Sequence, residues 1–309
     1  MKARIAVLGL GGVGGFAGAK LAAFYGPASG VEVSFLARGA TLAAVRERGL
    51  RLDFLGEETL ARPAGISDDP ACLGVQDFLI CAVKAYDLDG LVSSLRPAVG
   101  ESTVIVPFLN GVEGAEKLKE AFPENIVADG CAFIVSESRA PGEIAASMER
   151  YSYMFGLPGR RSERLADLEA LMRAAGLRAR LAADIERVVW EKFAFISPIS
   201  TLMSYVQKPY GEMAADAENM ADLERLLREF CEFAAAKGAD LPEGAYGSTL
   251  EKYRTLVSAD FTTSMQRDFA AGRKNELETL TGYVIRKAAE LGLELPCYEK
   301  YYKLLKRRG

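Results

Sequence analysis

The N-terminal stretch R-I-A-V-L-G-L-G-G-V-G-G, residues 4–15, decides the fold of this 309-residue chain. Its apolar run Arg4–Leu8 predicts a β-strand, and the alanine-rich run from Gly14 to Tyr25 predicts a helix. Between them lies the pattern G-x-G-x-x-G. A strand before this pattern and a helix after it are the context in which it binds a dinucleotide.

Each glycine of the pattern has a separate physical task. Gly9 permits the tight turn, Gly11 lets the backbone approach a pyrophosphate, and Gly14 lets the helix pack close to the sheet. The helix N-terminus offers N–H groups and a positive dipole end to phosphates. We therefore assign Gly9, Gly11, Gly12 and Gly14 to cofactor binding. The alternative is a glycine-rich turn without a ligand.

The second predicted strand indicates which dinucleotide is bound. NAD-binding folds usually end this strand with Asp or Glu, which binds the ribose hydroxyls. Here Val31–Leu36 is followed by Arg38 and by no acid at the strand end. A guanidinium attracts a 2′-phosphate and presents a planar fork of donors to it. The sequence therefore favours NADP, the alternative being an exposed loop arginine.

Strands and helices alternate through the first half of the chain, which predicts a parallel α/β sheet with right-handed crossovers. Further strands are expected at Phe78–Val83, at Thr103–Pro107 and within 125–135, and further helices at 41–48, 88–95, 112–122 and 162–175. The stretch 143–157 has strand-like runs that would extend the sheet, with an antiparallel pairing as one option, and 177–181 would be the last strand of the first domain.

The second half of the chain predicts helices almost exclusively, at 185–205, 218–238, 260–272 and 275–292. We place the boundary near Ala183, with an NADP-binding Rossmann domain over residues 1–182 and an all-helical substrate and catalytic domain over 183–309.

Composition excludes several function classes. The net charge of −4 gives no support to a nucleic-acid partner, and no apolar run reaches the length of a membrane span. The predicted strand begins too early to leave room for a signal peptide, and the five scattered cysteines form no C-x-x-C pair, so we expect a cytoplasmic protein with reduced thiols. The chain has no histidine, so we expect no histidine triad and no metal site.

Two polar residues follow predicted strands. Ligands of open α/β sheets lie beyond the carboxyl ends of the strands, where Lys84 and Asn110 stand. Both are candidates for binding the nicotinamide ribose or the substrate. The alternatives are a solvated loop lysine at 84, and a turn or helix cap formed by Asn110 with its following glycine.

A carbonyl reductase without histidine needs another proton donor, and the best candidate is Lys192 in V-V-W-E-K-F-A-F-I-S-P-I. A lysine in such an apolar helix is partly desolvated, which makes it a better acid. The alternative is a lysine whose head reaches water while its stem lies along the core. Tyr210 is the next candidate donor.

At this point the sequence resembles the ketopantoate reductase (2-dehydropantoate 2-reductase) family along essentially its whole length. Besides the glycine motif, Arg38 and W-E-K at 190–192, the resemblance is carried by A-V-K at 82–84, L-N-G-V-E at 109–113, P-G-E-I at 141–144, S-M-Q-R-D at 264–268, K-N-E-L at 274–277 and G-L-E-L-P at 292–296.

The resemblance implies NADPH-dependent reduction of a 2-keto acid to a 2-hydroxy acid, namely ketopantoate to pantoate in pantothenate biosynthesis, with the active site between a Rossmann and a helical domain. It implies that Lys192 is the general acid and that Glu276 positions this lysine and the substrate. It also implies that Ser264 contacts the substrate, and that Lys84 and Asn110 lie by the nicotinamide and the substrate.

The sequence departs from the family at three positions that usually hold asparagine, which here are Ile196, Ser200 and Tyr210. Ser200 is retained as a candidate substrate contact. A relative with a different, more apolar keto substrate stays open, as does a dehydrogenase acting on imines or sugar acids. A non-catalytic NADP-binding regulatory protein is the alternative from another class. The sequence is compatible with a homodimer but does not define the oligomeric state.

Overall fold

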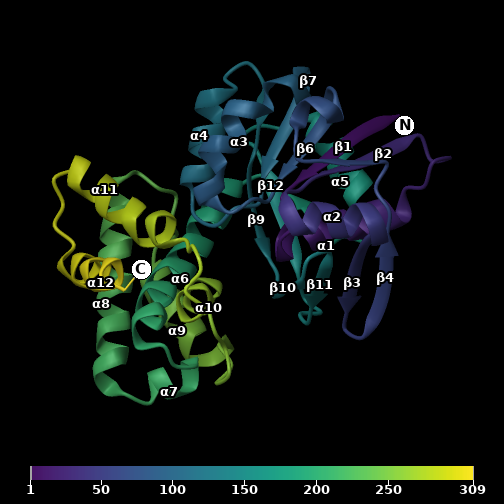
Figure 1. Ribbon diagram of the computed structural model, residues 1–309. Coiled ribbons are helices and arrows are strands. Elements are labelled where there is room, and N and C mark those ends of the chain that lie inside the picture. Colours follow the sequence, from purple (N-terminus) through teal and green to yellow (C-terminus); the bar gives the residue numbers. More distant parts are fainter. Residues whose placement is uncertain (1, 309) are drawn as a thin grey trace. The chain divides into compact units, whose positions relative to one another are not determined.

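The computed structural model describes residues 2–308, which form two compact units (Figure 1). One unit comprises Met1–Leu109 and Gly114–Ile185, and the other comprises Asn110–Glu113 and Glu186–Gly309. The four residues from Asn110 to Glu113 therefore group with the second unit, although both of their chain neighbours belong to the first.

The first unit is built on a six-stranded sheet in which every neighbouring pair is parallel. Its strand order is β5-β2-β1-β6-β7-β8, formed by Gly65–Ser67, Val31–Leu36, Ala3–Leu8, Gln76–Cys81, Val99–Pro107 and Ile126–Val127. Numbered within the sheet, this is the 3-2-1-4-5-6 order of the doubly wound dinucleotide-binding fold. The predicted Rossmann-type fold is confirmed.

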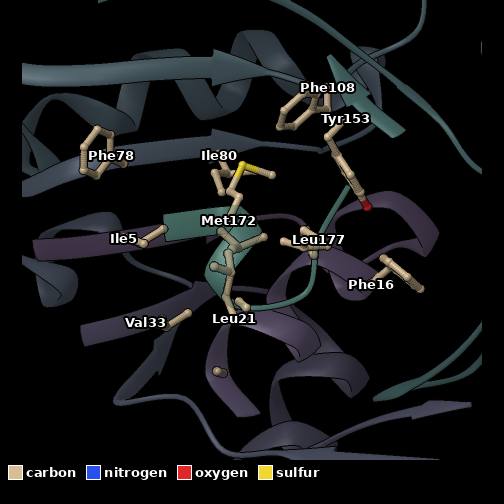
Figure 2. Packing of buried hydrophobic residues seen from close by; sticks show 14 of the residues in the cluster. Ile5, Phe16, Leu21, Val33, Phe78, Ile80, Phe108, Tyr153, Met172 and Leu177 are labelled. Carbon is tan, nitrogen blue, oxygen red and sulfur yellow. The ribbon is translucent and has the colours of Figure 1, made fainter. Parts of the chain in front are cut away.

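Helices cover both faces of this sheet because alternate strand residues point to opposite sides. Ile5 and Val7 of β1 belong to a core shared with α1 (Gly12–Phe24) and α5 (Glu163–Ala174). Figure 2 shows part of this core, where Ile5 and Ile80 of the sheet lie near Met172 of α5. The opposite face packs against α3 (Leu88–Leu95) and α4 (Glu113–Ala121). Helix α2 (Gly39–Arg48) follows β2.

Two smaller sheets complete the unit. One has the order β10-β11-β3-β4, formed by Ser136–Ala140, Glu143–Ala146, Leu50–Phe54 and Glu57–Ala61. The other has the order β13-β12-β9, formed by Ala179–Leu181, Ser152–Gly156 and Asp129–Phe133.

The expectation that residues 143–157 extend the main sheet is wrong. Strand β11 pairs with β3, whose hairpin with β4 was not predicted, and β12 lies antiparallel to β9 in a separate sheet. An apolar strand is recognisable from its own residues, but its partner is chosen by tertiary packing.

The second unit is helical, and no strand occurs among its described residues. Its helices are α6 (Ile185–Val206), α7 (Tyr210–Ala214), α8 (Ala217–Ala236), α9 (Ala245–Leu256), α10 (Ser264–Ala270), α11 (Tyr283–Glu290) and α12 (Pro296–Lys306), with a π-helical turn at Glu278–Gly282. Among residues 2–308 no helix is both long enough and apolar enough to span a membrane.

Helix α10 begins later than the predicted start at Asp260. Thr263 caps its N-terminus, accepting the N–H of Gln266 at 3.1 Å, while the Gln266 side chain accepts the N–H of Thr263 at 3.3 Å. This reciprocal capping box satisfies two backbone donors and sets the start of the helix at Ser264.

Candidate active site

The glycine turn after β1 lies where the strand order of the main sheet reverses, between β1 and β6. Gly9 has a φ of +89°, and a Cβ there would lie 2.9 Å from the Ala82 carbonyl oxygen, so this turn touches the segment after β6. A Cβ on Gly14 would lie 2.0 Å from the Gly9 carbonyl oxygen. The close packing of the turn and α1 therefore requires glycine at both positions.

No contact among the described residues requires glycine at position 11. Gly11 is the exposed N-cap of α1, its φ of −73° suits any residue, and a Cβ there would meet nothing within 4 Å. No side chain caps α1, and its first turn holds no acid. An open glycine beside an uncapped helix N-terminus fits a pyrophosphate. Gly12 opens the helix and packs on Ser136, whose carbonyl oxygen would lie 2.4 Å from an added Cβ.

Arg38 lies directly before α2 and is exposed. No side chain caps this helix, and its first turn holds no acid, so the helix N-terminus adds to the attraction of the guanidinium for an anion. Lys84 stands farther from its strand than predicted, because β6 ends at Cys81. It is half-buried, and its carbonyl oxygen accepts the N–H of Asp87 at 2.9 Å in a short 3₁₀ turn, Ala85–Asp87.

In the helical unit, Lys192, Asn110 and Glu276 come together from distant parts of the chain. The Lys192 Nζ donates to the Asn110 Oδ1 at 3.2 Å, and the Asn110 Nδ2 donates to the Glu276 Oε2 at 3.3 Å. Glu276 is 3% exposed, while Lys192 and Asn110 are half-buried. The amide thus links an ammonium to a buried carboxylate, and we call these three residues the lysine cluster.

The backbone around the lysine cluster explains how its members are held. Gly111 has a φ of +74°, and a Cβ there would lie 3.6 Å from Thr279 and 3.7 Å from Phe193, so the turn after Asn110 sits on both. The Glu276 carbonyl oxygen accepts the N–H groups of Thr279 and Leu280 at 3.1 and 2.9 Å. The π-helical turn that begins here is a rare conformation, found frequently at functional sites.

The other candidate residues of this unit lie on α6 and α10. Ile196 is half-buried and stands four residues after Lys192 on α6, so both can face the same side of the helix. Ser200 is 1% exposed, and its buried Oγ has no hydrogen-bond partner among the described residues. Ser264 is the half-buried first residue of α10. The structure therefore brings Asn110, rather than either serine, into hydrogen bonding with Lys192.

Tyr210 is not placed to donate a proton to a substrate. Its hydroxyl donates to the Tyr253 carbonyl oxygen at 2.7 Å, and burial raises its pKa. Tyr253, which was not singled out from the sequence, donates to the Phe195 carbonyl oxygen at 2.6 Å and lies 3.4 Å from that of Ala194. In an α-helix the Ala194 carbonyl would accept a hydrogen bond from the backbone N–H of residue 198, but Pro198 has no such N–H. The proline at position 198 was therefore the only sequence signal that pointed toward a donor such as Tyr253.

The doubly wound sheet with its open glycine turn, together with a lysine bound to an amide and a buried carboxylate, defines a pyridine-nucleotide-dependent oxidoreductase.

Comparison with known proteins identifies the family. The family model described as ketopantoate reductase PanE/ApbA matches residues 5–157, and the model of the C-terminal part of the same family matches residues 184–309. The chain therefore belongs to the ketopantoate reductase family.

Individual relatives agree with this assignment. The uncharacterized oxidoreductase YkpB of Bacillus subtilis strain 168 is 30% identical over 96% of this chain and 95% of its own. The 2-dehydropantoate 2-reductase of Mesorhizobium japonicum is 29% identical over 98% and 97%. The crystal structure of 2-dehydropantoate 2-reductase from Porphyromonas gingivalis W83 superimposes with a TM-score of 0.84 at 35% identity, covering 99% of this chain and 100% of that one.

Proposed function

We propose that this protein reduces a 2-keto acid to a 2-hydroxy acid with NADPH, and that 2-dehydropantoate, which would give pantoate for pantothenate biosynthesis, is the first substrate to test. The observation that carries the proposal is the lysine cluster, in which the Lys192 Nζ lies 3.2 Å from the Asn110 Oδ1. The relatives named 2-dehydropantoate 2-reductase support the choice of substrate class.

The lysine cluster supplies the proton of the reduction. A dinucleotide bound at the glycine turn would supply the hydride that adds to the carbonyl carbon, and the carbonyl oxygen would then need a proton. Lys192 gives this oxygen a proton from Nζ and recovers one from solvent. Asn110 directs the ammonium through its Oδ1, and Glu276 directs the amide of Asn110. A positioned proton donor of this kind accelerates turnover by roughly 10²- to 10⁴-fold.

The first unit supplies the residues for the dinucleotide. The turn at Gly11 and the uncapped N-terminus of α1 fit the pyrophosphate, and Arg38 with the N-terminus of α2 fits a 2′-phosphate. Lys84 is proposed to bind near the nicotinamide. The exposed arginine and the absence of an acid from the first turn of α2 favour NADPH over NADH.

A second candidate function follows from Ile196 and Ser200, which lie on the same side of α6 as Lys192, one and two helical turns further on. Ile196 offers no hydrogen bond, and the Ser200 hydroxyl is buried. Ketopantoate carries a hydroxyl group, and burying a hydroxyl without a partner costs about 1–3 kcal/mol. A branched 2-keto acid without the hydroxyl is therefore the alternative substrate, with Asn110 and Ser264 as candidate contacts for its polar groups.

The experiment is NADPH oxidation across a panel of 2-keto acids that includes ketopantoate and 2-ketoisovalerate. Lys192→Ala should lower kcat by roughly 10²- to 10⁴-fold with little change in NADPH affinity, and Glu276→Gln should lower it by less. Unchanged turnover in Lys192→Ala would mean that another group donates the proton. Tight NADPH binding without turnover of any acid in the panel would instead favour a regulatory NADP-binding protein.

A further inference from the structure

A second ionic arrangement lies beside the lysine cluster, and its centre is Arg286 of α11. One arm of its guanidinium, Nη2, donates to Glu113 Oε1 at 3.1 Å, and the other, Nη1, donates to Glu278 Oε2 at 3.0 Å. More than half of the 309-residue sequence separates Glu113 from Glu278, so a single side chain joins two distant segments.

These two segments are the ones that deliver Asn110 and Glu276 to Lys192. Glu113 ends the four-residue segment that begins with Asn110, and Glu278 comes two residues after Glu276. Arg286 therefore links the two chain segments whose side chains Asn110 and Glu276 hydrogen-bond each other within the lysine cluster.

The local backbone accommodates this link. A Cβ on Gly282 would lie 2.6 Å from the Glu278 Oε2 and 2.9 Å from the Arg286 Nη1, so the carboxylate and the guanidinium meet directly over this glycine. Nη1 also lies 3.4 Å from the Glu278 carbonyl oxygen. The Glu113 side chain is 22% exposed, which shields its ion pair from solvent more than that of Glu278, at 48%.

We propose that Arg286 is a positioning residue for the proton donor, acting through Glu113 and Glu278 on the geometry of the lysine cluster. The proposal rests on the proposed function. Partly exposed ion pairs contribute little to stability. A displacement of about 1 Å in a reacting group can nevertheless cost up to roughly 10²-fold in rate. Removing the guanidinium should therefore affect turnover far more than folding.

The chain offers a matched control. Lys306 pairs with the same Glu278 carboxylate at 2.7 Å, and its side chain is 53% exposed against 45% for Arg286, but it makes no ion pair with Glu113. Lys306→Gln removes a cation from Glu278 and leaves the link between the two segments in place. Arg286→Lys keeps the positive charge but replaces the planar guanidinium by a single ammonium, so it tests whether charge alone preserves part of the turnover rate.

The first experiment measures kcat, the KM for the keto acid, the NADPH dissociation constant and Tm. Arg286→Gln and Glu113→Gln should each lower kcat roughly 5- to 30-fold, and the double variant should lose no more than either alone. NADPH binding and Tm should stay near parental values, Arg286→Lys should recover part of the rate, and Lys306→Gln should stay within about twofold. Equal losses in Arg286→Gln and Lys306→Gln, or a loss that follows Tm, would overturn the proposal.

A second experiment separates this proposal from the proposed function. If the parent protein reduces no 2-keto acid, the proposed function fails, and Lys192 is then observed directly. Its side-chain NMR signal in lysine-labelled protein is assigned by its disappearance in Lys192→Arg. The signal should move in Arg286→Gln and Glu113→Gln and stay in place in Lys306→Gln. An unmoved signal in all three variants overturns the positioning role without reference to activity.

Discussion

Replacing Gly11 with alanine is a direct test of the cofactor site, because the added methyl group would contact no other atom in the part of the protein that the structure describes. No atom lies within 4 Å of the new Cβ, and the φ of −73° is ordinary for alanine. Lower chain entropy in the unfolded state stabilises such a variant by about 0.4–1 kcal/mol. Alanine is a poorer N-cap than glycine by a similar amount. The two effects offset, so the free energy of unfolding should change by less than about 1 kcal/mol.

The same methyl group would stand where the pyrophosphate is proposed to approach the backbone. Its overlap with a phosphate oxygen should weaken NADPH binding at least about tenfold, or about 1.4 kcal/mol. The assay is NADPH titration by calorimetry or nicotinamide fluorescence, with thermal denaturation on the same samples. Gly14→Ala is the matched control, because its Cβ would lie 2.0 Å from the Gly9 carbonyl oxygen and should cost about 3 kcal/mol of stability or more. Parental NADPH affinity in a folded Gly11→Ala variant would refute the reasoning.

Three further outcomes are expected. Arg38→Ala should weaken NADPH binding and leave NADH binding nearly unchanged, and equal losses measured for the two cofactors would show that this arginine does not bind the 2′-phosphate. Ile196→Asn should raise kcat/KM for ketopantoate relative to 2-ketoisovalerate, since an amide can bind the substrate hydroxyl; an unchanged ratio argues that this position is outside the pocket. Burial alone would raise the pKa of Asp222, but hydrogen bonds from Tyr301 and Lys300 outweigh this effect and lower the pKa. The ionised carboxylate therefore stabilises the fold at pH values above the ordinary pKa of an Asp. This stabilisation is lost as pH falls through the lowered pKa of Asp222. Asp222→Asn should therefore lose about 1.5–3 kcal/mol of unfolding free energy in urea at neutral pH and much less near pH 2, and a loss independent of pH would contradict this account.

The main sheet could be predicted because its signals are local. Buried parallel strands such as 78–81 are nearly continuously apolar, and the glycine turn identifies the first strand by its own residues. The hairpin of β3 and β4 gave no such signal. Its strands carry charged residues such as Arg51 and Glu58, and the other partner of β3 is β11, about 90 positions further along the chain.

For the candidate site, too, the residues with a local sequence signal could be predicted and the contacts between distant segments could not. Lys192 stands out as a charge in an apolar helix, and Asn110 stands out in an Asn-Gly pair at a strand end. The pairing of Arg286 with Glu113 was invisible, because both are ordinary charged residues of helix surfaces, 173 positions apart. The burial of Ser200 also depended on packing, since serine is an exposed residue in most proteins and its side chain does not itself indicate a buried position.

The four residues from Asn110 to Glu113 set a limit on how this enzyme can be recombined with its relatives. A chimera that joins the first 185 residues of one homologue to the helical half of another receives Asn110 from one parent and Lys192 and Glu276 from the other. The amide would then meet an ammonium and a carboxylate that were never selected together. An active chimera must take residues 110–113 from the same parent as the helical half, so the exchanged sequence consists of two separate stretches of the chain.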